Sequence, residues 1–317
     1  WGLADADAIS QGIALADFDL DGDLDLVVTR LDAPAQLFRN DATASRIAVR
    51  ALGPAVGAVV EVKSGARPRQ AREVTVGGHY LSGSDALLAF AADRDSAATV
   101  VVRWRDGRVR VIADARADRE YEVRPPDSAA APAPGPVAMS PARAVALFED
   151  ATALLGGHRH FETAYDDYRR QPLLPNKLSQ LGPGLAWLDA NADGREDLVV
   201  GAGKGGALTV LTQSGGRFNA HRVGSPAQGD LLALAVLPDG RGGERLAVSQ
   251  ANYEAEDFSL ALGQPSVLAV DLRGGAPVTG ATIAGGDSAS VGALAAGDVN
   301  GDGQLDLFVG ARVRGGA

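Results

Sequence analysis

One acidic pattern of twelve residues occurs three times in this chain. It reads DFDLDGDLDLVV at 17–28, DANADGREDLVV at 189–200 and DVNGDGQLDLFV at 298–309. Aligned without gaps, the copies share Asp at positions 1, 5 and 9, Asp or Asn at position 3 and Gly at position 6, and apolar residues flank each copy. Because this order is typical of a strand, a tight turn and a second strand, the chain is predicted to contain β-hairpins with acidic turns.

The acidic turns carry the ligand types that a hard cation prefers. Ca²⁺ takes about six to eight oxygen ligands at about 2.3 to 2.6 Å, and a glycine permits the sharp bend between them. The sequence therefore predicts about three calcium sites. The predicted side-chain ligands are Asp17, Asp19, Asp21 and Asp25; Asp189, Asn191, Asp193 and Asp197; and Asp298, Asn300, Asp302 and Asp306. Position 7 is Asp23, Arg195 or Gln304, so only its backbone carbonyl can serve all three loops.

Two other kinds of acidic loop share part of this pattern. An EF-hand needs a Glu at position 12 and a following helix, whereas position 12 is Val28, Val200 or Val309 within an apolar run. An acidic turn that binds no ion is the second alternative, and three copies in one register argue against it. Without a cation, neighbouring carboxylates would repel one another by roughly 1 kcal/mol or more per pair.

Composition restricts the partners. The chain has 317 residues, of which 46% are hydrophobic, and a formal net charge of −10. This charge disfavours nucleic acid and anionic membranes as partners, and no apolar run is long enough to insert into a membrane. The lack of cysteine excludes disulfides, thiolate metal sites and cysteine nucleophiles. Because the first residues contain neither an initiator Met nor a signal pattern, we expect the chain to begin inside a longer protein.

The spacing of the motifs predicts the architecture. The second and third copies begin 109 residues apart, and a degenerate copy without the ligand series lies between them at 231–250. A period of roughly 50 to 60 residues, with several short strands and Gly-rich turns in each unit, is typical of β-propeller blades. The predicted fold class is therefore all-β.

The three acidic motifs resemble the FG-GAP or VCBS repeats of integrin-like β-propellers, whose hairpin loops have the form D-x-[DN]-x-D-G-x-x-D. This resemblance implies that Ca²⁺ binds the hairpin loops of 17–25, 189–197 and 298–306. The degenerate blade near 231–250 is expected to bind no metal.

A different region separates the first and second motifs. Residues 46–124 contain several β-rich runs separated by Gly, Asp and Ser, which predicts a small β-sandwich or barrel. The runs VGAVVEV, HYLSGSD and VVVRWRDGRV resemble the ASPIC/UnbV domain of the cartilage acidic protein family and its bacterial relatives.

These assignments predict four parts. Residues 1–45 form a terminal propeller blade, 46–124 the ASPIC/UnbV-like domain, 125–144 a Pro/Ala-rich linker with a short helix, and 145–317 further blades. The helix is expected to start at Ser140 and Pro141 and to run through ARAVALFED. On this division the first blade ends one propeller and residue 145 begins another, so neither ring closes within the chain.

Other residue groups suggest catalysis. His158 and His160, with nearby acidic residues, form the densest group of potential transition-metal or acid/base side chains. GAGKGG at 201–206 lacks the spacing of a phosphate-binding loop. Ser82 and Ser84 lie near His79 and Asp85, but nearness in sequence is not the geometry of a catalytic triad.

We therefore expect a non-enzymatic, calcium-binding protein in which the calcium is structural. Loops of this chemistry suit the Ca²⁺ concentrations outside cells, so a secreted, cell-surface or periplasmic location is expected. The loops would provide a surface for adhesion to a protein or glycan ligand. The alternatives are a propeller-based hydrolase or lyase with a site near His158 and His160, and a propeller that only spaces other domains.

Overall fold

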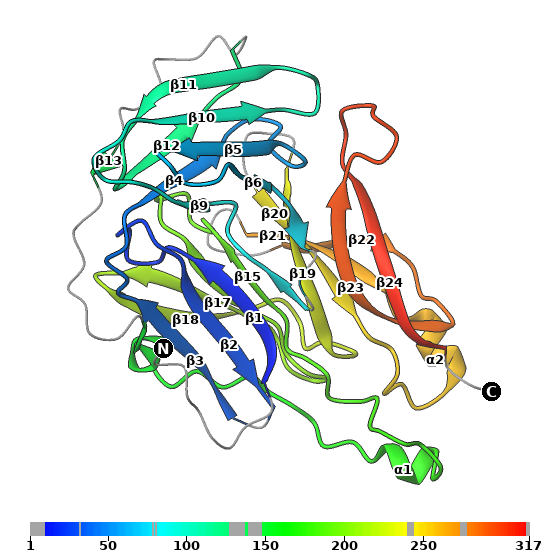
Figure 1. Cartoon of the computed structure of the whole chain (residues 1–317). Helices are drawn as coiled ribbons and strands as arrows, with labels where there is room; N and C mark the ends of the chain where they lie inside the picture. The colour runs from blue at the N-terminus through cyan, green and yellow to red at the C-terminus, as the bar shows by residue number, and fades with distance from the viewer. Residues whose placement is uncertain are drawn as a thin grey trace.

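The regular structure in the described part of the chain is mostly β-sheet (Figure 1). The structure is a computed structural model that describes residues 10–31, 33–77, 79, 81–126, 137–138, 148–239, 244–272 and 278–314. Helical segments in these ranges are limited to α1 (Asp167–Arg170), α2 (Phe258–Gly263) and the 3-10 turn η1 (Thr152–Leu155). The predicted all-β class is confirmed. No helix of the described part of the chain is long and apolar enough to cross a membrane.

The first blade takes its fourth strand from a distant part of the chain. Its order is β1 (Ser10–Ala16), β2 (Asp25–Arg30), β3 (Ala33–Asn40) and β14 (Phe148–Asp150). In the β3–β14 pair, Phe148 lies opposite Asn40. Residues 148–150 were expected to end a short helix, and they are extended because β3 presents a free edge that pairs with them. Residues 140–147 of that expected helix lie outside the described residues.

The next three sheets follow the chain in order. The second and third sheets contain four-strand antiparallel meanders, as in propeller blades, and the fourth contains an antiparallel hairpin. The second contains β15 (Leu185–Leu188), β16 (Asp197–Val200), β17 (Leu208–Ser214) and β18 (Arg217–Val223). The third contains β19 (Leu231–Pro238), β20 (Glu244–Gln250), β21 (Val267–Asp271) and β22 (Val278–Ala284), and the fourth contains β23 (Ala289–Gly297) and β24 (Asp306–Arg314). The degenerate copy forms the β19–β20 hairpin, and its turn at 240–243 lies outside the described residues.

Buried side chains between neighbouring sheets join the four blades into one arc. The shared cores place Val27 with Trp187, Val199 with Leu246, and Ala235 with Leu294. This differs from the expected division into the end of one propeller and the start of another. The apolar face of the first sheet is covered by the second sheet, and each large side chain buried in this way contributes about 1.5 to 3 kcal/mol.

Residues 46–123 form the predicted sandwich, and residues 137–138 of the expected linker add a strand to one of its sheets. One sheet has the order β11–β10–β5–β6 and the other β13–β12–β4–β9. Their bounds are β4 (Arg46–Ala51), β5 (Val59–Ser64), β6 (Gln70–Glu73), β9 (Leu88–Ala91), β10 (Ala98–Arg103), β11 (Val109–Ala115), β12 (Arg119–Val123) and β13 (Val137–Ala138). Alternate residues of β10, such as Val100, face Ile47 and Phe90 of the other sheet across a continuous core. This period-2 burial is what produces a sandwich.

A segment of the sandwich domain reaches the innermost strands of the blades. Between β6 and β9 the chain forms β7 (Val76–Gly77), which pairs with β23, and β8 (Ser82–Gly83), which pairs in parallel with β15. Ser82 Oγ accepts a hydrogen bond from Ile13 N of β1 at 2.9 Å. A Cβ atom on Gly83 would lie 2.9 Å from the carbonyl oxygen of Leu234 in β19. Residues 76–83 therefore contact the first strand of every described blade.

The same segment accounts for the polar residues of HYLSGSD. Ser84 Oγ accepts a hydrogen bond from Leu15 N at 3.1 Å, and the Asp85 N–H donates to the Leu15 carbonyl oxygen at 2.8 Å. Together with Ser82, these residues dock the sandwich onto β1. Their polar groups satisfy the exposed backbone of an inner strand, which is the role that the structure assigns to them.

Candidate metal centres

All three acidic loops connect the first two strands of a blade. They follow β1, β15 and β23, and the ninth motif residue begins β2, β16 or β24. Figure 1 shows the sandwich beside the end of the blades from which the β1–β2 loop projects. The apolar strands place the loops, and the acidic residues shape them.

The first aspartate of each loop folds the turn around its own carboxylate. Asp17 Oδ1 accepts a hydrogen bond from Asp21 N at 3.1 Å, and Oδ2 accepts one from Gly22 N at 2.8 Å. The equivalent distances are 3.0 and 2.8 Å for Asp189, and 3.1 and 3.0 Å for Asp298. Because three different sequence contexts give one arrangement, the motif itself determines the turn.

The ninth aspartate joins the loop to its blade. Asp25 Oδ2 accepts a hydrogen bond from Phe18 N at 3.0 Å, and Oδ1 accepts one from Asn40 N of the third strand at 2.7 Å. Asp197 accepts from Ala190 N and Gln213 N in the same way, at 3.2 and 2.8 Å. In the third loop Asp306 accepts from Val299 N at 2.8 Å. The sequence analysis predicted these residues as ligands, and the structure shows that their carboxylates anchor the loops.

Two positions of each loop, rather than one, adopt left-handed backbone. The glycine at position 6 was expected to do so, and φ is 90° at Gly22 and 83° at Gly194. Position 4 also has positive φ, with 60° at Leu20 and 59° at Ala192. A residue with a Cβ atom costs about 1 to 2 kcal/mol in this region, so sequence reasoning from glycine alone missed the second bend. The signal that could have revealed it is Gly301, which occupies position 4 in the third loop.

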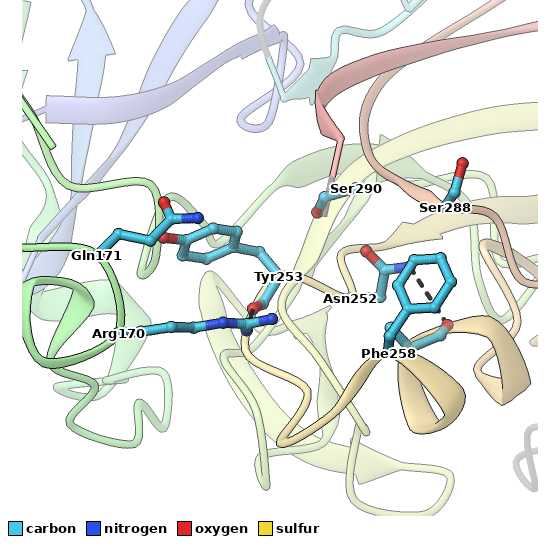
Figure 2. A pocket seen from close by; sticks show the side chains of 8 residues that line it. Arg170, Gln171, Asn252, Tyr253, Phe258, Ser288 and Ser290 are labelled. Atoms are coloured by element: carbon cyan, nitrogen blue, oxygen red, sulfur yellow. Dashed lines mark hydrogen bonds between the residues drawn. The ribbon is translucent and has the colours of Figure 1, made fainter. Parts of the chain in front are cut away.

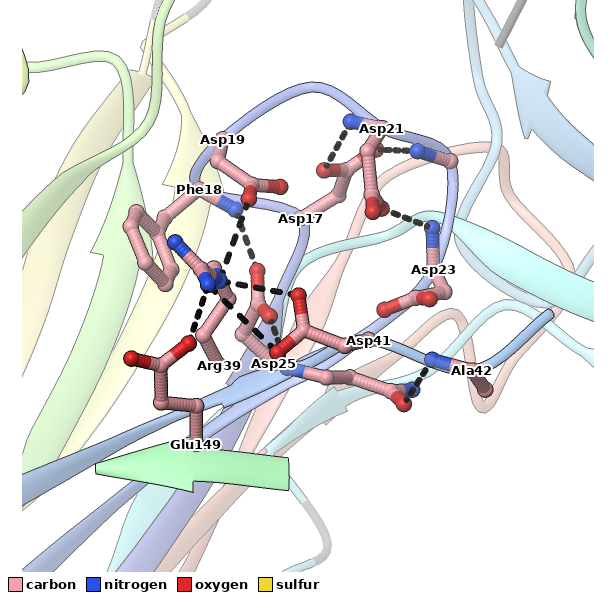
Figure 3. Close-up of polar contacts among 12 residues, drawn as sticks. Asp17, Phe18, Asp19, Asp21, Asp23, Asp25, Arg39, Asp41, Ala42 and Glu149 are labelled. Atoms are coloured by element: carbon pink, nitrogen blue, oxygen red, sulfur yellow. Dashed lines mark hydrogen bonds and ion pairs between the residues drawn. The ribbon is translucent and has the colours of Figure 1, made fainter. Parts of the chain in front are cut away.

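The first loop brings three predicted ligands together. One carboxylate oxygen each from Asp17, Asp19 and Asp21 lies within 4.8 Å of the other two (Figure 3). Asp25 is fully buried at the base of the loop. The side chain of Asp23 faces Arg46, with Nη2 2.8 Å from Oδ2, so a ligand at position 7 would have to be the backbone carbonyl, as the sequence predicts.

The electrostatics of the first loop favour a bound cation. Burial, followed by repulsion from Asp21, raises the pKa of Asp19 to about 6 and that of Asp23 to about 8. Burial also raises the pKa of Asp17 to about 7 and that of Asp25 to about 9. Clustered buried carboxylates ionise readily only beside compensating positive charge. The oxygen-only donor set therefore fits a hard divalent cation such as Ca²⁺.

The second and third loops repeat this geometry nearer to solvent. Asn191 Nδ2 donates to Asp193 Oδ2 at 3.1 Å, and Asn300 Nδ2 donates to Asp302 Oδ2 at 3.0 Å, so the predicted ligands at positions 3 and 5 are neighbours. Arg195 N and Gln304 N donate to the position 5 carboxylate, at 2.9 and 2.8 Å. Use of the position 7 carbonyl by an ion stays a prediction.

An arginine of the sandwich domain faces each loop. Arg46 contacts Asp21 and Asp23 of the first loop, and Arg50 Nη1 lies 3.5 Å from Glu196 Oε1 of the second. Burial alone would raise the pKa of Asp298 in the third loop, but backbone hydrogen bonds and the charge of Arg105 lower it. Arginines of the sandwich therefore lie near all three acidic loops.

The segment around His158 does not gather its polar groups into one centre. Asp166 caps α1 by accepting from Tyr168 N and Arg169 N, and buried Asp167 accepts from Leu178 N and Ser179 N. Burial, followed by the charges of His160 and Arg222, lowers the pKa of His158. The clusters of potential metal ligands in the described ranges contain neither His158 nor His160.

Comparison with known families agrees with this arrangement. Residues 50–130, most of which form the sandwich, match the family model described as ASPIC and UnbV. Residues 290–317, which include the third acidic loop, match the FG-GAP repeat model. The chain contains an ASPIC and UnbV domain and an FG-GAP repeat. Both predicted resemblances are thereby confirmed, and the FG-GAP repeat identifies the meander sheets as propeller blades. No curated protein matches the chain.

Proposed function

We propose that this protein is a calcium-binding, extracellular β-propeller protein in which Ca²⁺ is structural and the ion-fixed loops, with the ASPIC and UnbV domain, form a binding surface for a protein or glycan. The observation that carries this proposal is the common hydrogen-bond scheme of the three acidic loops. FG-GAP repeats commonly bind calcium, and the loop containing Asp298 lies within the matched repeat.

The contact between loops and sandwich gives the ion a specific task. Arg46 and Arg50 reach acidic loop residues from β4, the first strand of the sandwich. A Ca²⁺ ion that orders the loops would also fix these arginine contacts, because the same loop backbone positions both. Calcium would then hold the ASPIC and UnbV domain in one position on the blades. A rigid surface of two domains is well suited to recognising an extended ligand.

The test is thermal unfolding with Ca²⁺ and with a chelator, combined with calorimetric titration to count sites. Filling one site at about 100 times its Kd stabilises the folded state by about 2.7 kcal/mol. Asp19→Ala removes a carboxylate of the three-oxygen cluster and should abolish one equivalent of binding with little effect in chelator. Asp25→Ala also removes the anchors to Phe18 and Asn40, so it should destabilise the protein in both conditions. The exposed Asp114→Ala is the matched control.

Two outcomes would contradict the proposal. The first is a wild-type unfolding midpoint that is the same in Ca²⁺ and in chelator. The second is an Asp19→Ala variant that loses equal stability in both conditions. His158→Ala and His160→Ala test the enzymatic alternative: turnover of a glycoside or ester substrate that depends on these histidines would favour a propeller hydrolase or lyase.

A further inference from the structure

A second acidic cluster lies outside the three hairpin motifs. One carboxylate oxygen each from Glu162, Asp230 and Glu254 lies within 4.8 Å of the other two. Asp230 immediately precedes β19, whereas the acidic hairpin loops follow the equivalent strands β15 and β23. The cluster therefore lies at the opposite end of the blades from the hairpin loops. None of its residues belongs to the D-x-[DN]-x-D-G-x-x-D pattern.

Two of these carboxylates are deeply buried. Asp230 and Glu254 are each only 3% exposed. Asp230 Oδ1 accepts a hydrogen bond from Lys204 N at 3.1 Å, and Glu254 Oε1 accepts one from Gln180 N at 3.2 Å. Glu254 Oε2 is buried without any hydrogen-bond donor. A buried carboxylate oxygen without a donor is costly, and a cation is one of the few groups that can compensate it.

Two basic side chains near the cluster donate hydrogen bonds to backbone oxygens. Lys204 Nζ donates to the Glu254 carbonyl oxygen at 2.8 Å. Arg170 Nη1 donates to the carbonyl oxygens of Tyr253 and Ala255, at 2.9 and 3.1 Å, and its guanidinium lies 5.8 Å from the centre of the Tyr253 ring. Figure 2 shows Arg170 beside Tyr253 at the edge of a small pocket. Their hydrogen bonds fix the backbone of 253–255, and an oxygen of the Glu254 carboxylate lies beside those of Glu162 and Asp230.

The surrounding loops leave room for the third carboxylate. A Cβ atom on Gly203 would lie 2.3 Å from Glu162 Oε1, so a side chain at this position would displace the carboxylate. Gly203 N also donates to the Phe161 carbonyl oxygen at 2.9 Å, which ties the two loops together. GAGKGG, whose spacing does not fit a phosphate-binding loop, is thus explained as the loop that accommodates Glu162.

We propose that Glu162, Asp230 and Glu254 bind one divalent cation of the size of Ca²⁺ and so link the second and third blades at the end opposite the hairpin loops. The donors are all oxygens, which favours a hard cation. Two oxygens bound to one Ca²⁺ lie up to about 5.2 Å apart, and the three carboxylate oxygens of this cluster lie within that limit of one another. Mg²⁺ demands near-ideal octahedral geometry at about 2.1 Å and usually keeps several waters, so a cage of protein carboxylates suits Ca²⁺ better.

The experiment counts bound Ca²⁺ by equilibrium dialysis and calorimetry on the intact chain. Glu254→Gln should reduce the number of bound ions by one and reduce the Ca²⁺-dependent rise in the unfolding midpoint. Glu256→Gln, an exposed change two residues away, should alter neither. Glu162→Gln affects a half-buried residue and is expected to keep the fold while weakening this site at least tenfold, which provides a second variant if Glu254→Gln does not fold.

The hairpin loops provide an internal reference. Asp19→Ala should remove a different ion, so the double variant Asp19→Ala/Glu254→Gln should lose two equivalents. If only Asp19→Ala lowers the count, the second site does not exist although the hairpin sites do. If Glu254→Gln and Glu162→Gln both retain every bound ion, the proposal is overturned, and the cluster is held by protons or by neighbouring cations. If the site of Glu162, Asp230 and Glu254 binds an ion in Mg²⁺ solution but not in Ca²⁺ solution, the assignment of ion size is overturned.

Discussion

Arg50 lies where the sandwich meets the blades, and its replacement should be among the most damaging single changes. Its guanidinium forms a bidentate pair with Asp85, with Nη1 to Oδ1 at 2.6 Å and Nη2 to Oδ2 at 2.9 Å. It also contacts Glu120 at 3.3 Å and Glu196 at 3.5 Å. The Asp85 side chain is 3% exposed, and its backbone N–H is held by Leu15 of the first blade. The Arg50 guanidinium therefore joins the sandwich, the first blade and the second acidic loop.

The expected loss of stability follows from the buried carboxylate of Asp85, which Arg50→Met leaves without its partner. Removing one partner of a buried ion pair costs about 3 to 5 kcal/mol, because the remaining charge is buried without compensation. The Arg50 side chain is 22% exposed, so we expect a value near the lower limit of this range. At about 2 °C per kcal/mol for a large domain, the midpoint of thermal unfolding should fall by roughly 6 °C.

Differential scanning calorimetry measures this fall in the unfolding midpoint, and a second arginine variant serves as the matched control. Arg69→Met removes an exposed arginine whose Nη1 lies 3.4 Å from Glu61 Oε2, and exposed pairs are worth about 0 to 1 kcal/mol. The double variant Arg50→Met/Asp85→Asn should recover about 1 kcal/mol or more, because the stranded carboxylate is neutralised. Equal losses for Arg50→Met and Arg69→Met would refute the reasoning.

Three further changes test other contacts. In Gly184→Ala the new Cβ atom would lie 1.6 Å from the Leu232 carbonyl oxygen, so the free energy of unfolding measured by chemical denaturation should fall by about 3 kcal/mol. Gly285→Ala is the control, because its Cβ atom would meet open space and the free energy of unfolding should be nearly unchanged. Burial opposes ionisation of Asp167, but hydrogen bonds from Ser179 and Leu178 lower its pKa. The wild type should therefore lose stability as the pH falls through this depressed pKa. Asp167→Ala should be destabilised by about 2 kcal/mol at neutral pH, and its free energy of unfolding should depend less on acidic pH. Gln213→Ala removes the hydrogen bond from Nε2 to the Phe18 carbonyl oxygen at 2.6 Å, so hydrogen exchange should accelerate in the first acidic loop and remain unchanged in the third.

The acidic loops could be predicted in detail because their contacts are local. The carboxylate of Asp17 bonds to residues four and five positions ahead, and the same spacing holds at Asp189 and Asp298. Because these hydrogen bonds join residues of the same nine-residue segment, the segment forms the same turn in three different sequence contexts. The second left-handed residue was missed because Leu20 and Ala192 carry no compositional sign of positive φ.

What the sequence determined by itself is therefore the β class, the hairpins and the shape of their acidic turns, since alternation of apolar residues and acidic spacing act within a few positions. Only the tertiary structure decided that β14 completes the first blade, that residues 76–83 cross the inner strands, and that Glu162, Asp230 and Glu254 converge. The physical reason is that these contacts join free strand edges and buried charges from distant segments. Such groups have many potential partners along the chain, and packing of the whole molecule selects among them.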